Sequence, residues 1–345
     1  MSTVATPDTV VAARPAVAQT RPGWMFSPTV DLLVVANLAW PLIAWSTYAV
    51  TDPATTKAFG FLLAYFLLTP HRWITLLLVF GDRDKFAQRP KAFLGVAAAV
   101  AIGGWLTQWS MGTLTLLMAL DYLWNAWHFT AQHSGVYGIY GRLSETKRSA
   151  LIDKVVLRTF ILFTLVRLIG SFLPVEERGG EWLTWMTPVA STLAWCDYFV
   201  LAMPAVLLVG DLFGFRARRA GRVTYLLSVY SLYGLLLIAV RLDHTALKLG
   251  CATAATFFHS AEYMGVVSWA VQKNRGLQKQ RLFAHLVPRW TMWLIAFMAF
   301  FAVSAYLLKD RFFYAWVWAN LVVSLLHYAY DGMIWKRPRP AKSTA

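Results

Sequence analysis

The chain has few cysteines and few charged residues for its length. Only two of its 345 residues are cysteines, Cys196 and Cys251, and both lie in or beside apolar runs. Two such residues provide neither a disulfide framework nor a cysteine-based metal site. Charged residues make up 14% of the chain, whereas a soluble domain carries roughly 25%. With 58% hydrophobic residues, this composition predicts an all-α, polytopic integral membrane protein.

Acidic residues are scarcer than basic ones. The chain has 17 Asp and Glu against 32 Lys and Arg, which gives a net charge of +15. In a soluble protein this excess would suggest nucleic-acid binding. Here the basic residues lie in short loops between apolar runs, where they set the orientation of a membrane protein. We therefore expect no nucleic-acid partner.

Apolar runs long enough to span a bilayer, about 20 residues, recur along the whole chain. The ten candidates lie at roughly 29–49, 59–80, 92–110, 114–137, 155–173, 189–213, 223–240, 251–271, 290–308 and 313–335. A more polar stretch, 274–289, is expected to form an interfacial helix. No Gly- or Pro-rich linker divides the chain, so 23–337 is predicted to be a single transmembrane domain. Residues 1–22, which lack a signal-peptide pattern, and residues 338–345 are expected to be cytoplasmic tails, the first of them flexible.

The loops between these runs alternate in charge. Loops after the second, fourth, sixth, eighth and tenth runs are rich in Lys and Arg, and the others are poor in them. The loop after the fifth run carries Glu176, Glu177 and Glu181 instead. Because basic loops stay in the cytoplasm, the alternation predicts an even number of helices with both termini cytoplasmic. The expected location is a bacterial inner membrane.

Five histidines fall inside the predicted spans. His71 lies in the second span, His128 and His133 in the fourth, His259 in the eighth and His327 in the tenth. These four spans all run toward the cytoplasm. At 1.5 Å per residue, the five imidazoles lie roughly 13–21 Å above the cytoplasmic edge. They are therefore predicted to share one layer near the middle of the membrane.

The fourth span carries a polar stripe within DYLWNAWHFTAQH. At 100° per residue, Asp121, Asn125, His128 and Gln132 fall within about 60° of one another. His133 lies about 140° from His128 on the same helix. One centre can use both histidines only with help from other helices. The stripe predicts that this span forms one wall of a buried polar centre.

Acidic residues accompany two of the other histidines. Glu262 follows His259 by three residues, and Asp331 follows His327 by four. Ionisable groups inside a bilayer are costly unless they are paired or functional. The alternative is that each membrane histidine only packs or hydrogen-bonds between helices. For His133 considered by itself, this is the simpler interpretation. The predicted metal ligands are His71, His128, His259, His327 and His133, and the predicted catalytic acids are Glu262, Asp331 and Asp121.

Neutral imidazole together with carboxylate suits iron, zinc, copper or manganese. The lack of thiolates argues against a structural zinc site. Iron, as one ion or as a di-iron centre, suits a buried site that activates dioxygen for an apolar substrate. The expected partners are membrane lipids, the apolar substrate and, for a hydroxylase or desaturase, a cytoplasmic electron donor. A dioxygenase would need no such donor.

In layout the chain resembles the integral-membrane histidine-motif iron oxygenases, desaturases and hydroxylases. Its nearest likeness is to the Brp/Blh type of carotenoid-cleaving dioxygenase, in which single histidines on separate helices converge on iron. The resemblance rests on the contexts of His71, His128, His259 and His327, spread over most of the chain. The HxxHH boxes of desaturases and fatty-acid hydroxylases are absent. The resemblance implies an iron-dependent oxidation of a lipid, isoprenoid or carotenoid.

Two other functions fit the same histidines. A b-type cytochrome would use His71, His128, His259 and His327 as two axial pairs for haem b. A proton-coupled or small-molecule transporter would use the layer as a proton relay or a substrate site. The sequence shows no repeated pair of broken helices, which often marks a transport site.

Overall fold

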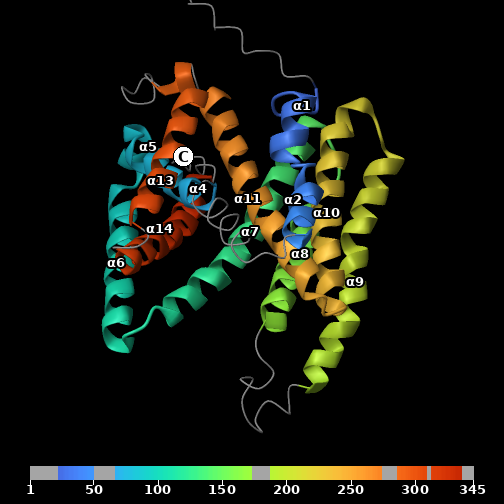
Figure 1. Cartoon of the computed structure of the whole chain (residues 1–345). Helices are drawn as coiled ribbons and strands as arrows, with labels where there is room; N and C mark the ends of the chain where they lie inside the picture. Colours follow the sequence, from blue (N-terminus) through green and yellow to red (C-terminus); the bar gives the residue numbers. More distant parts are fainter. Residues whose placement is uncertain (1–21, 50–66, 173–186, 274–285, 309–311, 336–345) are drawn as a thin grey trace, which may run out of the picture.

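The computed structural model describes five stretches of the chain (Figure 1). These are residues 22–49, 67–172, 187–273, 286–308 and 312–335. The described residues form helices joined by turns, with no strand among them, which confirms the all-α prediction. The two predicted tails, the loop that carries Glu176, Glu177 and Glu181, and most of the predicted interfacial helix lie outside the described residues.

Helices make up most of the described chain. In order they are α1 (Pro28–Val30), the π-helix η1 (Asp31–Val35), α2 (Trp40–Ala49), α4 (Thr69–Phe80), α5 (Arg83–Gln88), α6 (Pro90–Met111), α7 (Thr115–Leu143), α8 (Ala150–Phe172), α9 (Thr187–Phe213), α10 (Ala220–Arg241), α11 (Thr245–Lys273), α13 (Trp290–Leu308) and α14 (Phe313–Ile334). Two short 3₁₀ turns, η4 (Ala217–Arg219) and η5 (Val287–Arg289), precede α10 and α13.

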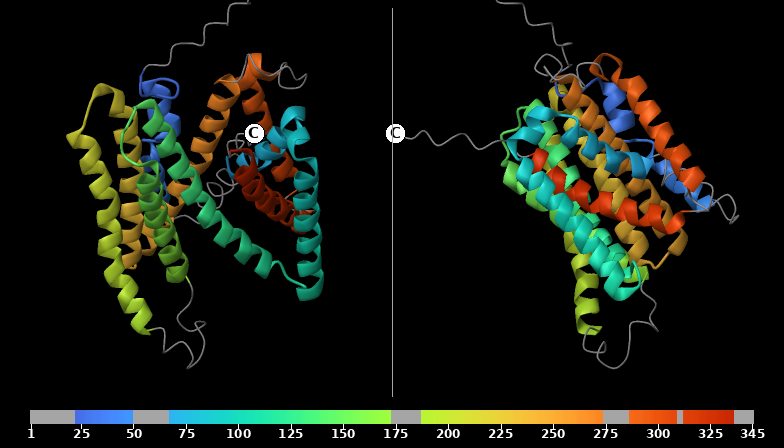
Figure 2. Two further views of the ribbon diagram at one scale, coloured as in Figure 1. Left: turned by 180° about the vertical axis from the view of Figure 1, so that it is seen from behind. Right: turned by 90° about the vertical axis from the view of Figure 1, so that its left-hand side faces the viewer.

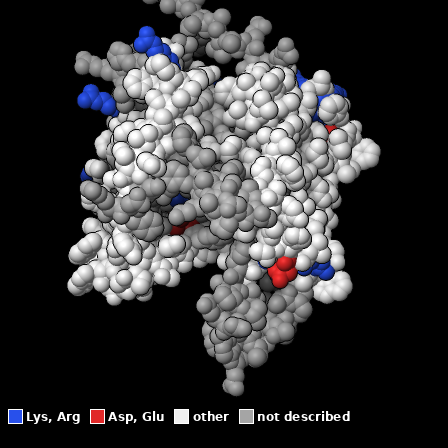
Figure 3. Space-filling view, viewed as in Figure 1, with Lys and Arg blue, Asp and Glu red and all other residues white. Residues whose placement is uncertain are grey.

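Five segments of the described chain are long and apolar enough to cross a membrane. They are Pro28–Ala49, Pro90–Met111, Ala194–Phe213, Ala217–Arg241 and Trp290–Leu308. Among the described residues on the face shown in Figure 3, few are Lys, Arg, Asp or Glu. The structure therefore fits a helical membrane protein, but it does not support a count of about ten spans. The helix α4 is described over only 12 residues. The other predicted spans outside these five correspond to α7, α8, α11 and α14, each of which carries charged residues or histidines within its apolar run.

The helices form two groups, which α7 and α11 join. One group contains α4, α5, α6, α13 and α14, and the other contains α2, α8, α9 and α10 (Figures 1 and 2). The oblique helices α7 and α11 pack against members of both groups and against each other. A large apolar core fills the second group, and two smaller cores lie in the first. The polar residues of α7 and α11 are thereby placed where the two groups meet.

A proline precedes the histidine of α4. Pro70 is the second residue of α4, and Leu67 and Leu68 before it already have helical backbone. A proline within a helix removes one backbone hydrogen bond. His71 follows it, with 1% of its surface exposed. The helix directs this ring toward α11 and α14, since it packs against both.

Candidate metal centre

The structure brings the five predicted histidines into one buried cluster. They come from four helices: His71 from α4, His128 and His133 from α7, His259 from α11 and His327 from α14. All five are buried. The His128 ring centroid lies 4.9 Å from that of His259 and 4.6 Å from that of His327. The His71 centroid lies 5.3 Å from His259 and 5.0 Å from His327.

Several ring nitrogens in this cluster have no hydrogen-bond partner in the described part of the chain. These are Nε2 of His71 and both Nδ1 and Nε2 of His259. Leaving a buried polar atom unpaired costs about 1–3 kcal/mol, so three such atoms side by side call for a ligand. Nε2 of His128 lies 3.0 Å from Nε2 of His327. Neighbouring ligand atoms around a metal bound at about 2.1 Å are separated by roughly 3 Å.

Three overlapping donor sets have the spacing that a metal ion needs. Within each set one ligand atom per residue lies within 4.8 Å of the others, and all members are buried. The sets are His71, His259 and His327; His128, His327 and Asp331; and His133, His259 and Glu262. Two of the three combine two imidazoles with one carboxylate, the donor combination of non-haem iron(II) oxygenases.

The Asp331 carboxylate is held by donors on one side and faces histidines on the other. Its Oδ1 accepts a hydrogen bond of 2.6 Å from the Tyr263 hydroxyl and one of 3.2 Å from Trp335 Nε1. Its Oδ2 lies 3.9 Å from His128 Nε2 and 4.0 Å from His327 Nε2. The hydrogen bonds thus fix the carboxylate with one oxygen directed at the cluster.

Thr75 orients His327 in the same way. Its hydroxyl lies 2.6 Å from His327 Nδ1 and 2.7 Å from the Tyr263 hydroxyl. Because Nδ1 is engaged, Nε2 is the His327 nitrogen that faces His128. Such outer contacts fix the ring orientation of metal-binding histidines.

His133 and Glu262 both have several hydrogen-bond partners within the protein. Glu262 accepts hydrogen bonds from the Tyr225 hydroxyl and, at 2.7 Å, from Gln132 Nε2. His133 Nδ1 lies 3.0 Å from both the Tyr225 hydroxyl and Glu262 Oε2. Its Nε2 lies 3.0 Å from the Tyr233 hydroxyl. Both His133 nitrogens therefore have protein partners, unlike those of His259.

Asp121 lies outside the three donor sets. It accepts hydrogen bonds from the Ser324 hydroxyl and, at 3.1 Å, from the Tyr328 hydroxyl. Arg72 Nη2 lies 3.9 Å from its other oxygen. The Tyr328 ring separates this carboxylate from the cluster and lies 5.0 Å from the His128 ring. Asp121 is thus one residue removed from the histidines, and its predicted catalytic role stays a prediction.

Two tyrosines that contact the cluster were not among the predicted site residues. Tyr225 and Tyr233 belong to α10, an apolar helix without histidines or acids. They are eight residues apart, so the same helix face presents both. That spacing is the only available signal, and aromatic residues at helical spacing are common in any core. Their importance becomes visible only through their contacts with His133 and Glu262.

A cationic group lies at the α5 end of the cluster. Lys85 belongs to α5, outside the candidate spans. Burial lowers the pKa of Lys85, and attraction to Asp82 and Asp331 opposes that shift. The Asp82 carboxylate lies 4.0 Å from Lys85 Nζ.

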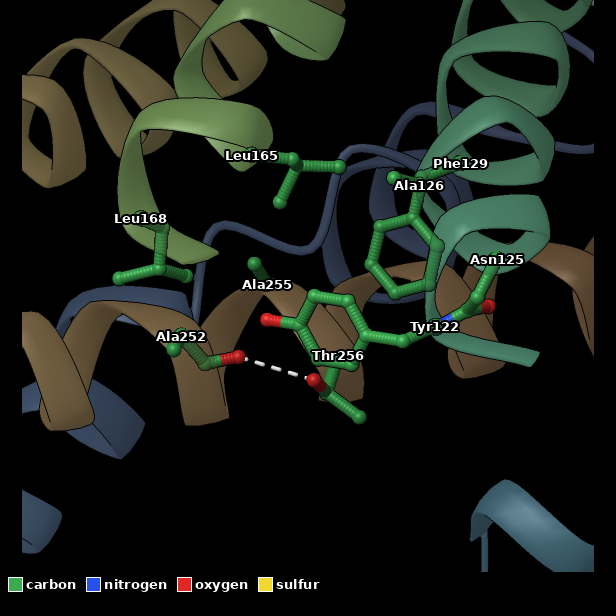
Figure 4. Close-up of a pocket in the computed structure, with 9 residues that line it drawn as sticks. All are labelled: Tyr122, Asn125, Ala126, Phe129, Leu165, Leu168, Ala252, Ala255 and Thr256. Atoms are coloured by element: carbon green, nitrogen blue, oxygen red, sulfur yellow. Dashed lines mark hydrogen bonds between the residues drawn. The ribbon is translucent and has the colours of Figure 1, made fainter. Parts of the chain in front are cut away.

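A small cavity of about 90 Å³ borders the cluster (Figure 4). It lies between α7, α8 and α11. Its walls are formed by Tyr122, Asn125, Ala126, Phe129, Leu165, Leu168, Ala252, Ala255 and Thr256. Phe129 connects the cavity to the cluster, because its ring stacks on His259 with a centroid distance of 3.9 Å and an interplanar angle of 11°. Asn125, part of the predicted polar stripe, thus faces the cavity and not the donor sets.

Comparisons with known proteins do not supply a function. No family model, no curated protein and no solved structure matches the chain.

Proposed function

We propose that the chain is a membrane-embedded iron oxidoreductase that acts with dioxygen on a lipid, isoprenoid or carotenoid substrate. The observation that supports it is the convergence of histidines from four helices with three buried ring nitrogens that lack hydrogen-bond partners in the described structure. If the histidines served only to pack the helices together, these nitrogens would be expected to have hydrogen-bond partners within the protein. A metal ion would satisfy them together, since neutral imidazole is a common metal ligand.

The donor types favour iron among the available metals. Imidazole and carboxylate without thiolate suit several divalent ions, and the set of His128, His327 and Asp331 is the combination used by non-haem iron(II) oxygenases. The sets overlap at His327 and His259, so the same residues suit one ion or two adjacent ions. When bound, iron supplies the redox chemistry that amino-acid side chains cannot perform with dioxygen.

The protein residues would hold the ion and shape its surroundings. His71, His128, His259 and His327 are the proposed ligands, and Asp331 supplies a carboxylate. Thr75 and Tyr263 fix the orientation of His327 and Asp331, as outer contacts of a metal site do. The buried, aromatic surroundings keep water away from the reacting centre.

His133 and Glu262 have a different proposed role. Their hydrogen bonds to Tyr225, Tyr233 and Gln132 hold the α7, α10 and α11 side of the cluster in place. We propose that they position His259, because Gln132, which donates to Glu262, also donates from Nε2 to the His259 carbonyl oxygen at 2.8 Å.

The ring packing favours a bare ion over haem b. Two axial histidines lie on opposite faces of a porphyrin, which must separate their rings. Here His128 and His327 contact each other through Nε2 at 3.0 Å. His71 meets both His259 and His327 edge to face.

A transporter is the second candidate, and a break in the first helical segment favours it. Helix η1 ends at Val35 and α2 begins at Trp40. Between them Asn37 has a φ of 42° and is 1% exposed. Both polar atoms of its side chain lack a partner in the described part of the chain. Broken helices of this kind line substrate sites in secondary transporters.

We further propose a bacterial inner membrane as the location, with both termini on the cytoplasmic side. The alternating loop charge supports this orientation. If the reaction needs an electron donor, the basic loops would dock an acidic partner there. Reporter fusions after Arg83 and after Glu181 test it, and a cytoplasmic signal from the Glu181 fusion would contradict it.

Lipid extracts test the reaction. Extracts from cells with the wild-type gene, with His128→Ala, with His259→Ala and without the gene are compared by mass spectrometry, under air and under nitrogen. Only wild-type cells under air are expected to contain an oxidised lipid. Identical profiles in all samples would favour the transporter.

A further inference from the structure

The cavity beside the cluster is built from three helix faces at regular spacing. The α7 residues at its walls are Tyr122, Asn125, Ala126 and Phe129, which follow an i, i+3, i+4, i+7 pattern. Helix α8 contributes two leucines, and α11 contributes two alanines and a threonine (Figure 4). The space exists because short alanine side chains occupy positions where the three helices face one another.

The lining changes in character from one side of the cavity to the other. Leu165, Leu168 and Ala255 are all buried, with exposed fractions of 9%, 3% and 2%. Tyr122 is 45% exposed and marks the side that faces the surroundings of the protein. Thr256 has its hydroxyl engaged, since it donates a hydrogen bond of 2.9 Å to the Ala252 carbonyl oxygen. The deep part of the cavity is therefore apolar.

A single ring separates this apolar space from the proposed metal ligands. Phe129 lines the cavity and stacks on His259, whose two ring nitrogens lack hydrogen-bond partners among the described residues. A group held in the cavity would thus lie one aromatic ring from the centre.

We infer that the cavity binds the end of an apolar hydrocarbon chain, which enters past Tyr122 from the bilayer and stops beside Phe129. The inference rests on the proposed function and narrows its substrate class. An apolar cavity of about 150 Å³ holds benzene, and this cavity, at about 90 Å³, is smaller. It accommodates the last few carbons of a flexible chain and not the middle of a rigid polyene.

Photolabelling of the purified full-length protein tests the inference. The probe is a long-chain fatty acid with a diazirine at its methyl end, and the matched probe carries the diazirine beside the carboxyl group. The methyl-end probe is expected to label peptides that contain Leu165 or Ala255. The carboxyl-end probe is expected to label elsewhere.

Cavity-filling variants make the test specific. Ala255→Leu and Ala252→Leu should each lower labelling of these peptides by about tenfold or more, equivalent to roughly 1.4 kcal/mol of binding. Ala98→Leu, at an exposed position of α6, is the control and should label like the wild type. Circular dichroism and the gel-filtration profile in detergent show whether each variant is folded. Two filling variants are used so that the test still stands if one of them does not fold.

The results of this experiment test chain binding in the cavity independently of the proposed iron centre. Unchanged labelling in both filling variants, with metal retained, would overturn chain binding in the cavity and leave the iron centre standing. Cavity-specific labelling of a protein that binds no metal would overturn the proposed function and support chain binding. His259→Ala should lose metal and keep the labelling, because the cavity wall is formed by Phe129.

Discussion

Two of the buried polar clusters in the described structure differ in how many of their polar atoms have hydrogen-bond partners. In the arginine–aspartate cluster, Arg222 donates to Asp211 at 2.9 Å and to Asp153 at 2.8 Å. Arg148 donates to Asp153 at 2.6 Å and lies 3.1 Å from Asp211, while Tyr137 donates to Asp211 at 2.6 Å. Two cations thus balance two anions, and Arg222 Nη1 alone lacks a hydrogen-bond partner among the described residues.

The histidine cluster lacks this closure. Its imidazoles meet one another, and its open nitrogens point at no donor or acceptor in the described structure. A closed network stabilises the structure through its internal pairs, whereas an unpaired polar group in a low-dielectric interior is costly. A ligand from outside the chain would satisfy the open nitrogens. We therefore interpret the arginine–aspartate cluster as structural and the histidine cluster as functional.

The largest expected effect is the loss of iron in His259→Ala. This change removes the ring with two unpaired nitrogens and should weaken iron binding by more than about 100-fold, while the folded protein remains in the membrane. Metal analysis of the purified variant measures it. His244→Ala, outside the cluster, is the control and should keep its iron. Wild-type iron content in His259→Ala would show that His259 is not a ligand.

Arg222→Ala should produce the opposite pattern. It leaves two buried carboxylates without their main partner, so the free energy of unfolding should fall by about 3–5 kcal/mol. Iron per folded chain should not change. Denaturant unfolding in detergent measures the stability, and Arg216→Ala, at an exposed site, should stay within about 0.5 kcal/mol of the wild type. Iron loss without destabilisation would reverse our assignment of the two clusters.

Tyr263→Phe should weaken iron binding by about 10–100-fold. The change deletes the hydroxyl that fixes Asp331 and contacts Thr75. Metal competition with a chelator measures the affinity. Tyr330→Phe removes another buried hydroxyl, bonded to the Phe93 carbonyl oxygen, and should leave the affinity unchanged. Equal losses in both variants would mean that tyrosine removal acts through general destabilisation.

The smallest expected effect belongs to Tyr233→Phe. It removes the partner of His133 Nε2 and should cost about 1 kcal/mol of stability, with iron affinity lowered by less than about tenfold. The same chelator assay and unfolding experiment measure both quantities. Complete iron loss in this variant would place His133 among the ligands.

The clustering of the histidines could be predicted because helical rise converts sequence position into distance along a helix. In the predicted topology all four helices run in one direction, so the distance from a basic residue gave a shared level for His71, His128, His259 and His327. The pairing of Asp331 with His327 followed from a spacing of four residues. Each of these features depends only on the spacing of residues within a single helix.

Features that depend on how helices pack could not be predicted. The contact of Arg72 with Asp121 joins α4 to α7, and no periodicity encodes it. The break at Asn37 lies within a continuous apolar run, so composition gave no sign of it. The predicted count of about ten spans is not supported, since five segments of the described chain are long and apolar enough to cross a membrane.

The most direct test is the metal content of the full-length protein, purified in detergent after iron-replete growth and measured by elemental analysis. We expect between about one and two iron ions per chain, because the overlapping donor sets suit either one ion or an adjacent pair. Iron should be released when the ligands are protonated or a chelator is added. A content of less than about 0.2 transition-metal ions per chain, in folded protein that also takes up no metal when metal is added back, would contradict a metal centre.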